Sequence, residues 1–207
     1  GFIAAPSANV SGRPSPTNAA HVIEDLSGKV DVIIDAGNCS VGVESTVLDI
    51  TSSPPVILRP GGITLEQLEE VLRQVSLDPT ILAEKNRDFV PKAPGMKYKH
   101  YSPKGQIIIV EGAIDSVVSK INELIAEYSS KGIRVGVMST SQTSSSYHGA
   151  EVISLGDRKN VSEIAANLFK VMREFDEKDI EIILAESVSS SGIGLAIMNR
   201  LNKAAGY

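Results

Sequence analysis

The sequence predicts an α/β protein of two parts joined by a proline-rich linker. Residues 104–207 alternate continuous apolar runs with amphipathic segments of helical period. Residues 1–75 mix short strand patterns with helical ones, and residues 76–103 hold four prolines and no sustained period. Apolar strands separated by amphipathic helices are typical of a parallel sheet covered on both faces. We therefore expect a twisted mixed sheet in the first part and a small Rossmann-like parallel sheet of four strands in the last.

In the first part, apolar β-branched runs predict strands and a spacing of three or four predicts helices. The expected strands are 30–35, 44–50 and 56–58, and the expected helices are 18–26 and 65–75. The second helix has a clear start signal, because Thr64 is a good N-cap residue and Gln67 follows three residues later, as in a capping box.

The last part follows the same rules with longer elements. The expected strands are 107–110, 133–138, 151–155 and 180–184, and the expected helices are 113–130, 161–175 and 193–204. In the first of these helices, Ile114, Val117, Ile121 and Leu124 recur on one face, as in a helix that packs on a sheet.

Composition excludes several classes of protein. The 207 residues are 42% hydrophobic and 22% charged, which is typical of a globular chain and not of collagen or a disulfide scaffold. No apolar run approaches the about 20 residues of a membrane span, so we expect no membrane partner. Cys39 is the only cysteine, so no intrachain disulfide or cysteine-based metal site forms, which fits a cytoplasmic protein. The net charge of −5 argues against a protein that coats nucleic acid.

Residues 4–17 are the densest polar segment. Ser7, Asn9 and Ser15 lie there among small residues and three prolines. Small side chains let backbone N–H groups approach a ligand, and hydroxyl and amide groups suit phosphate or ribose oxygens. The alternative is a polar, proline-rich turn before the first helix.

Two further loops could face a ligand. Residues 37–47 form a Gly/Ser loop that could present Ser45 and Thr46, although both could equally be strand residues. Arg59 ends an apolar strand before a Gly-Gly turn, where its guanidinium could fork onto phosphate oxygens or form a surface salt bridge.

Two weaker signals remain. Residues 97–103 interleave basic and aromatic side chains, a pattern that suits base stacking but is also found in solvated linkers. Residues 190–194 open a helix and could hold an anion at its N-terminus, or serve only as a turn. Neither a P-loop nor an H-E-x-x-H motif is present, and the three histidines are scattered, so chemistry would rest on positioning and electrostatics.

These motifs together resemble one family. Ala-Ala-Pro-Ser-Ala-Asn-Val-Ser-Gly at 4–12, Val-Glu-Ser-Thr-Val at 43–47 and Leu-Arg-Pro-Gly at 58–61 look like the back half of a YrdC-type domain. Lys-Tyr-Lys-His-Tyr-Ser-Pro at 97–103, followed by an α/β domain, is similar to the long two-domain form of the threonylcarbamoyl-AMP synthases. The resemblance covers essentially the whole chain, in family order.

The resemblance implies an activity. The family condenses L-threonine, bicarbonate and ATP to threonylcarbamoyl-AMP and pyrophosphate, usually with Mg²⁺. The product feeds the t6A modification of adenosine 37 in tRNA, so the downstream tRNA threonylcarbamoyl transferase complex is an indirect partner.

The resemblance also implies which residues bind the substrates. Those expected at ATP are Ser7, Asn9, Ser15, Arg59, His100 and Tyr101, and those expected at L-threonine are Ala5 and Ser45. No residue is assigned a covalent catalytic role. The segment with Tyr101 is expected to close over the nucleotide as a lid that excludes water.

The resemblance divides the chain at two points. Residues 1–75 correspond to the C-terminal part of the catalytic domain, 76–103 to the linker or lid, and 104–207 to the Rossmann-like domain. The family's front half of the YrdC-type domain, with its Lys-x-Arg element, has no counterpart here. We therefore expect activity of the parent protein and not of residues 1–207 alone, which should expose apolar surface and be poorly stable.

Two other functions remain open. The lysines between residues 92 and 104 could form an RNA-binding module, whose binding would depend strongly on salt. The Rossmann-like part could be a nucleotide-sensing regulator.

Overall fold

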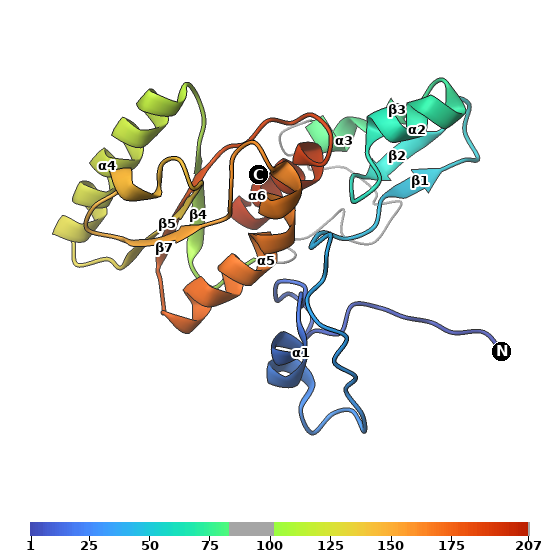
Figure 1. Cartoon of the computed structure of the whole chain (residues 1–207), viewed down its shortest axis with the longest axis horizontal. Helices are drawn as coiled ribbons and strands as arrows, with labels where there is room; N and C mark the ends of the chain where they lie inside the picture. The colour runs from blue at the N-terminus through green and yellow to red at the C-terminus, as the bar shows by residue number, and fades with distance from the viewer. Residues whose placement is uncertain (83–101, 207) are drawn as a thin grey trace.

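The computed structural model describes residues 1–82 and 102–206, and Figure 1 shows two sheets at opposite ends of the molecule. The smaller sheet has the order β1-β2-β3, formed by Val47–Asp49, Val56–Arg59 and Ser76–Leu77. β1 runs antiparallel to β2 and β3 runs parallel to it, so the sheet is mixed, as expected. The helices of this part are α1 (Ala19–Leu26), α2 (Leu65–Leu72) and α3 (Pro79–Leu82).

The larger sheet is parallel throughout and has the order β4-β7-β5-β6. Its strands are Gln106–Val110 (β4), Val135–Ser139 (β5), Glu151–Ser154 (β6) and Ile182–Glu186 (β7). Helix α4 (Ile114–Ser130) covers one face, and α5 (Val161–Glu177) and α6 (Gly194–Ala205) cover the other. The short 3₁₀ helix η1 (Ser144–Ser146) lies in the segment 139–146, which is rich in Ser and Thr. The predicted four-stranded Rossmann-like domain is confirmed.

Side-chain caps start α1 and α2 within one residue of their predicted starts. The side chain of Asn18 accepts a hydrogen bond from the N–H of His21 at the start of α1. The capping box of α2 is present, with Thr64 N donating to Gln67 Oε1 over 2.9 Å. This helix ends at Leu72 rather than at residue 75, because Arg73 takes a φ of 63° that no helix continues.

One expected strand is absent. Residues 30–35 form no strand, and Val32 and Ile34 are 75% and 86% exposed. A β-branched run supplies propensity only, and a strand also needs a partner with which to pair its backbone groups.

Residues 76–82, at the start of the segment that we expect to be a linker, are not irregular. Instead Ser76 N donates to Pro55 O over 2.9 Å, which adds β3 to the edge of β2. Asp78 then accepts from Thr80 N over 3.0 Å, and Pro79 takes the first position of α3. The sequence Asp-Pro-Thr at 78–80 is itself a helix-start signal, because Asp is a good N-cap residue and Pro is favoured at the first helical position.

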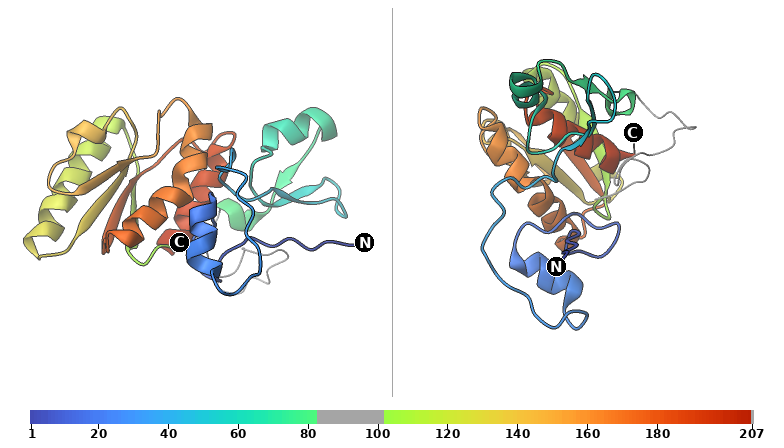
Figure 2. Two further views of the ribbon diagram at one scale, coloured as in Figure 1. Left: turned by 60° about the horizontal axis from the view of Figure 1, so that its bottom comes forward. Right: turned by 90° about the vertical axis from the view of Figure 1, so that its right-hand side faces the viewer.

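The two parts of the chain meet at α5 and α6 (Figure 2). Gly42 has a φ of +72°, and a Cβ built on it would lie 2.3 Å from Ala166 Cα in α5. Only glycine lets the 37–46 loop come this close. Arg173 of α5 and Arg200 of α6 are both 1% exposed, and both bond to residues of the N-terminal part.

Apolar exposure is concentrated in the N-terminal part, as expected. Within the described ranges, every exposed large apolar side chain except Ile114 lies between residues 2 and 72. The Rossmann-like domain buries its large apolar side chains in two clusters, one on each face of the sheet.

Candidate functional site

Arg59 and Ser45 form a polar pair at the first sheet. Arg59 is the last residue of β2, and its ladder partner is Val47 of β1, two residues after Ser45. The Nε and Nη2 atoms of Arg59 donate to Ser45 O over 3.1 and 2.9 Å, and Nη2 lies 3.4 Å from Ser45 Oγ. The arginine predicted for ATP and the serine predicted for L-threonine therefore lie side by side.

Ser15 is connected to this pair through Glu44, the residue before Ser45. The hydroxyl of Ser15 is buried and donates to Glu44 Oε1 over 2.9 Å. The other oxygen of Glu44 accepts from Arg200 Nε over 2.6 Å, and Arg200 Nη2 donates to Pro60 O over 3.1 Å. A buried arginine thus links the loop before β1 to the turn after β2.

Close backbone packing holds these two segments together. A Cβ on Gly61 would lie 2.2 Å from Glu44 O and 2.4 Å from Thr46 N. The Gly-Gly turn after Arg59 is therefore needed for contact with the 44–46 segment.

The other predicted site residues are placed differently. Asn9 closes its own turn, since its Nδ2 donates to Val10 O and to Arg13 O over 3.1 and 3.0 Å. Ala5 and Ser7 are exposed in the N-terminal extension, which points away from the rest of the molecule in Figure 1. His100 and Tyr101 lie outside the described residues.

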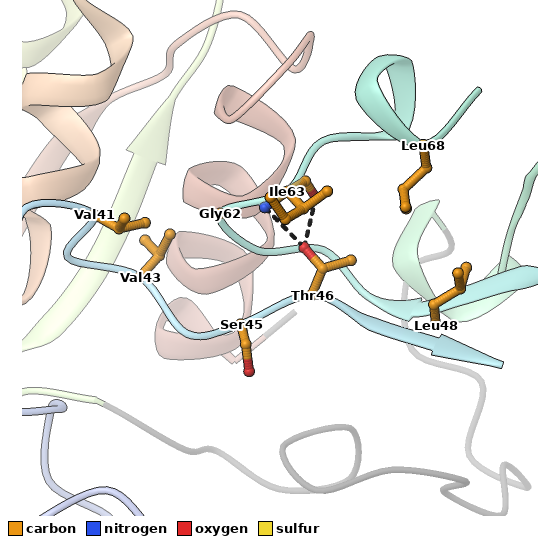
Figure 3. Close-up of a pocket in the computed structure, with 8 residues that line it drawn as sticks. All are labelled: Val41, Val43, Ser45, Thr46, Leu48, Gly62, Ile63 and Leu68. Carbon is orange, nitrogen blue, oxygen red and sulfur yellow. Dashed lines mark hydrogen bonds between the residues drawn. The ribbon is translucent and has the colours of Figure 1, made fainter. Parts of the chain in front are cut away.

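A cavity of about 500 Å³ adjoins the polar pair, and its walls are mostly apolar. Figure 3 shows its lining residues, which are Val41, Val43, Ser45, Thr46, Leu48, Gly62, Ile63 and Leu68. The hydroxyl of Thr46 is tied to the backbone of Ile63, and the side chain of Ser45 points away from the apolar side chains. The polar groups suited to phosphate or carboxylate therefore lie beside this cavity and not inside it.

Comparison with family models shows to which family the chain belongs. Residues 63–206 match the model of the threonylcarbamoyl-AMP synthase C-terminal domain, and residues 1–61 match the model described as telomere recombination, which covers the Sua5, YciO and YrdC proteins. The chain belongs to the threonylcarbamoyl-AMP synthase family. The family resemblance and the fold class that the sequence suggests are confirmed.

Curated relatives match almost the whole chain. Threonylcarbamoyl-AMP synthase of Pyrococcus abyssi is 53% identical over 99% of this chain and 58% of its own length. The Bacillus subtilis enzyme is 48% identical over 99% of this chain and 57% of its own length. The crystal structure of P. abyssi Sua5 complexed with L-threonine matches with a TM-score of 0.89 and 51% identity, over 98% of this chain and 57% of that one. This chain therefore spans somewhat more than half the length of these synthases.

Sequence reasoning missed the residues that join the two parts. Glu44 belongs to the Val-Glu-Ser-Thr-Val motif, and Arg173 and Arg200 lie in expected amphipathic helices, but no pattern assigns any of the three a role. A signal was present, because a helix face that buries an arginine needs a partner for its charge.

A second polar cluster lies at the carboxyl ends of β5 and β7. Glu186 is buried, and its carboxylate accepts from Tyr147 OH over 2.7 Å, from Thr140 Oγ1 over 3.0 Å, from Thr143 Oγ1 and from Arg158 Nη2. Burial and then the bond to Glu186 raise the pKa of Tyr147. Both oxygens of Glu186 are thus held by protein donors, so this cluster holds loops of the fold in place.

The backbone just before α6 binds a carboxylate of the protein itself, the side chain of Glu66. Gly192 N donates to Glu66 Oε1 of α2 over 3.0 Å. Hydrogen bonds from its own N–H, from Gly192 and from Thr64 lower the pKa of Glu66.

We expect Glu66→Ala to lower the free energy of unfolding by about 1 kcal/mol, because it removes a charge-assisted bond and a favourable charge at a helix N-terminus. Chemical denaturation of the complete gene product measures this loss. Glu70→Ala on the exposed face of the same helix is the control, and equal effects of the two changes would contradict this role of Glu66.

Lys203 lies one helical turn after Arg200 in α6. Burial removes water from its ammonium group, and the charges of Arg200 and Arg59 oppose it, so the pKa of Lys203 falls to about 8. The unfolded chain keeps this proton up to the ordinary pKa of 10.5. Between these two values unfolding takes up a proton, so this lysine makes the free energy of unfolding rise with pH.

We expect one lysine signal to titrate near pH 8 in NMR spectra of the ¹³C-methylated protein. Lys203→Arg should remove that signal and assign it, because arginine is not methylated under these conditions. A Lys203 signal that titrates together with those of the exposed lysines would contradict the burial of this amine.

In residues 1–82 and 102–206, no three His, Cys, Asp or Glu side chains come together in a way that could hold a metal ion. No helix in these ranges is long and apolar enough to cross a membrane.

Proposed function

We propose that the protein carrying this chain is an L-threonylcarbamoyladenylate synthase that condenses L-threonine, bicarbonate and ATP. The main support is the 53% identity to the P. abyssi synthase along 99% of this chain. Residues 1–75 would then belong to the catalytic domain, 76–103 to the linker and lid, and 104–207 to the Rossmann-like domain.

In the proposed reaction, the amine of L-threonine and bicarbonate condense to a carbamate with loss of water. A carbamate oxygen attacks the α-phosphorus of ATP, and the bond from that phosphorus to the bridging oxygen breaks, which releases pyrophosphate. Negative charge must be stabilised at the phosphoryl oxygens and on the leaving group, so fixed cations and hydrogen-bond donors next to them accelerate the step.

We assign the substrates to the residues that the family motifs mark. Arg59 binds phosphate, and Ser45 beside it binds L-threonine together with the backbone of Ala5. Ser7, Asn9 and Ser15 bind ATP, and His100 and Tyr101 close over the nucleotide. The contact between Arg59 and Ser45 supports placing phosphate and L-threonine next to each other, as attack of a threonine carbamate on phosphorus requires.

Mg²⁺ fits this site as an ion carried by ATP. The carboxylate next to Ser45 is Glu44, and both of its oxygens are already held by Ser15 and Arg200. The described residues therefore do not form a resident metal site, and we propose that Mg²⁺ binds to the ATP phosphates. No step above depends on a metal ligand from this chain.

We further propose that the product serves the t6A modification of tRNA adenosine 37 in the cytoplasm. Threonylcarbamoyl-AMP is a mixed anhydride of a carbamate and a phosphate, so it transfers its acyl group readily, and a transferase acting on tRNA must consume it. The chain would then need no stable RNA complex of its own, which agrees with its net charge of −5.

Pyrophosphate release from ATP by the complete gene product tests this function. We expect release that requires both L-threonine and bicarbonate. Release that ignores either substrate, or none from a folded protein, would contradict the proposal and favour an RNA-binding or nucleotide-sensing role.

A further inference from the structure

We propose that Arg200 of α6 is a positioning residue of the synthase site, which makes the Rossmann-like domain part of the catalytic machinery. This inference rests on the proposed function. Arg200 is 1% exposed, and its three nitrogens bond to Glu44 Oε2 (2.6 Å), Asn199 Oδ1 (2.7 Å) and Pro60 O (3.1 Å). Two of these three partners belong to the N-terminal part.

Those two partners stand next to the residues that would bind the substrates. Glu44 precedes Ser45 and accepts from Ser15 over 2.9 Å, and Pro60 follows Arg59. Ser15, Ser45 and Arg59 are the predicted site residues that the structure brings together. Each of them is a chain neighbour or a hydrogen-bond partner of Glu44 or Pro60, the two residues of the N-terminal part that Arg200 binds.

The geometry explains why an arginine is needed. Its planar guanidinium bonds to the Glu44 carboxylate through Nε and to the Pro60 carbonyl through Nη2, so it fixes the distance between the 44–46 segment and the 59–62 turn. A lysine at this position could pair with Glu44, but its ammonium group lacks the planar geometry that binds the Glu44 carboxylate and the Pro60 carbonyl at the same time.

Without Arg200, the Glu44 carboxylate would lie mostly buried without its countercharge, and the Pro60 carbonyl would lose a donor. We expect the 44–46 segment to move, and with it the Ser45 carbonyl oxygen that accepts hydrogen bonds from Arg59. A displacement of about 1 Å can cost about a hundredfold in rate when it separates reacting groups.

Another bond between the two parts provides a matched control. The bond from Gly192 N to Glu66 also joins the C-terminal domain to the N-terminal part, but within the described part of the chain Glu66 bonds to no predicted site residue. Glu66→Ala therefore reports the effect of losing an anchor between the parts, whereas Arg200 variants report the effect on the site.

The test measures kcat and KM for ATP and L-threonine in pyrophosphate release by the complete gene product. We expect Arg200→Met to lower kcat ten- to a hundredfold, Arg200→Lys to lower it less, and Glu66→Ala to leave it unchanged. Glu44→Met keeps the length of the side chain but has no oxygen that can accept from Arg200, so it should reproduce the loss. The Glu44→Met/Arg200→Met double variant should lose no more than the worse single one.

Arg200→Met with the wild-type kcat and KM would overturn the proposal, and so would losses that multiply in the double variant. If Arg200→Met does not fold, the Glu44→Met/Arg200→Met double variant decides, because it removes the same link and leaves neither buried charge unpaired, and full activity of that variant would overturn the proposal. A wild type that releases no pyrophosphate overturns the proposed function itself, a result distinct from an active wild type with unaffected variants.

Discussion

Replacing Arg59 by alanine should lower kcat/KM for threonine- and bicarbonate-dependent pyrophosphate release roughly a hundredfold or more. Arg59 is the guanidinium that the structure holds beside Ser45, where phosphate and L-threonine are proposed to meet. A fixed cation there costs no reorganisation during the reaction, so its loss acts on the transition state as well as on ATP binding. Steady-state kinetics with ATP and with L-threonine varied in turn measures the loss.

Two controls separate this role from simpler ones. Arg59→Lys keeps the charge but not the fork, so we expect only partial activity. Arg134→Ala removes a well-exposed arginine of the other domain and should leave activity unchanged. Retention of full activity by Arg59→Ala would contradict its assignment to phosphate.

The second large effect concerns stability. Arg173→Leu should lower the free energy of unfolding by about 3–5 kcal/mol, because it leaves the buried Asp25 carboxylate without its main partner. Arg173 Nη2 donates to Asp25 Oδ2 over 2.8 Å and to Pro14 O over 2.6 Å. Its loss should free α1 from α5, so limited proteolysis between residues 1 and 26 should accelerate along with the drop in stability.

The same pair predicts an acid response. Burial alone would raise the pKa of Asp25, but hydrogen bonds from Arg173 and Val10 N and the charges of Arg173 and Arg13 lower it below its ordinary value. The pair therefore stabilises the fold fully at pH values above the ordinary pKa of an aspartate. This stabilisation is lost as the pH falls through the lowered pKa of Asp25. Arg173→Leu should lack this part of the acid transition.

Lys170→Leu is the matched change, since Lys170 lies on the same helix in an exposed ion pair with Glu174. It should cost about 0–1 kcal/mol. Arg173→Leu combined with Asp25→Asn should recover part of the loss, because the unpaired buried charge is gone. An Arg173→Leu protein as stable as Lys170→Leu would contradict the anchoring role.

Local patterns predicted the Rossmann-like domain well. Its strands have apolar centres and its helices are amphipathic, so each element carries its own signal. The capping box at Thr64 and Gln67 was equally local. Residues 30–35 misled because a strand also depends on a partner, which a run of Val and Ile does not reveal.

The site was only partly predictable. The motifs placed Arg59 and Ser45 in one site, and the structure brings them into contact. It does not bring Ala5 or Ser7 near them, since both lie exposed in the N-terminal extension. The Arg200–Glu44 pair joins residues 156 positions apart, and no local pattern encodes such a contact.

The identity of the product tests the central claim most directly. The complete gene product is incubated with ATP, L-threonine and ¹³C-bicarbonate, and the adenylates are analysed by mass spectrometry. We expect threonylcarbamoyl-AMP with one added mass unit from the labelled carbon, and none when L-threonine is omitted. An adenylate that carries L-threonine without the labelled carbon, or no adenylate besides those of ATP, ADP and AMP, would contradict the assignment of this chain to threonylcarbamoyl-AMP synthesis.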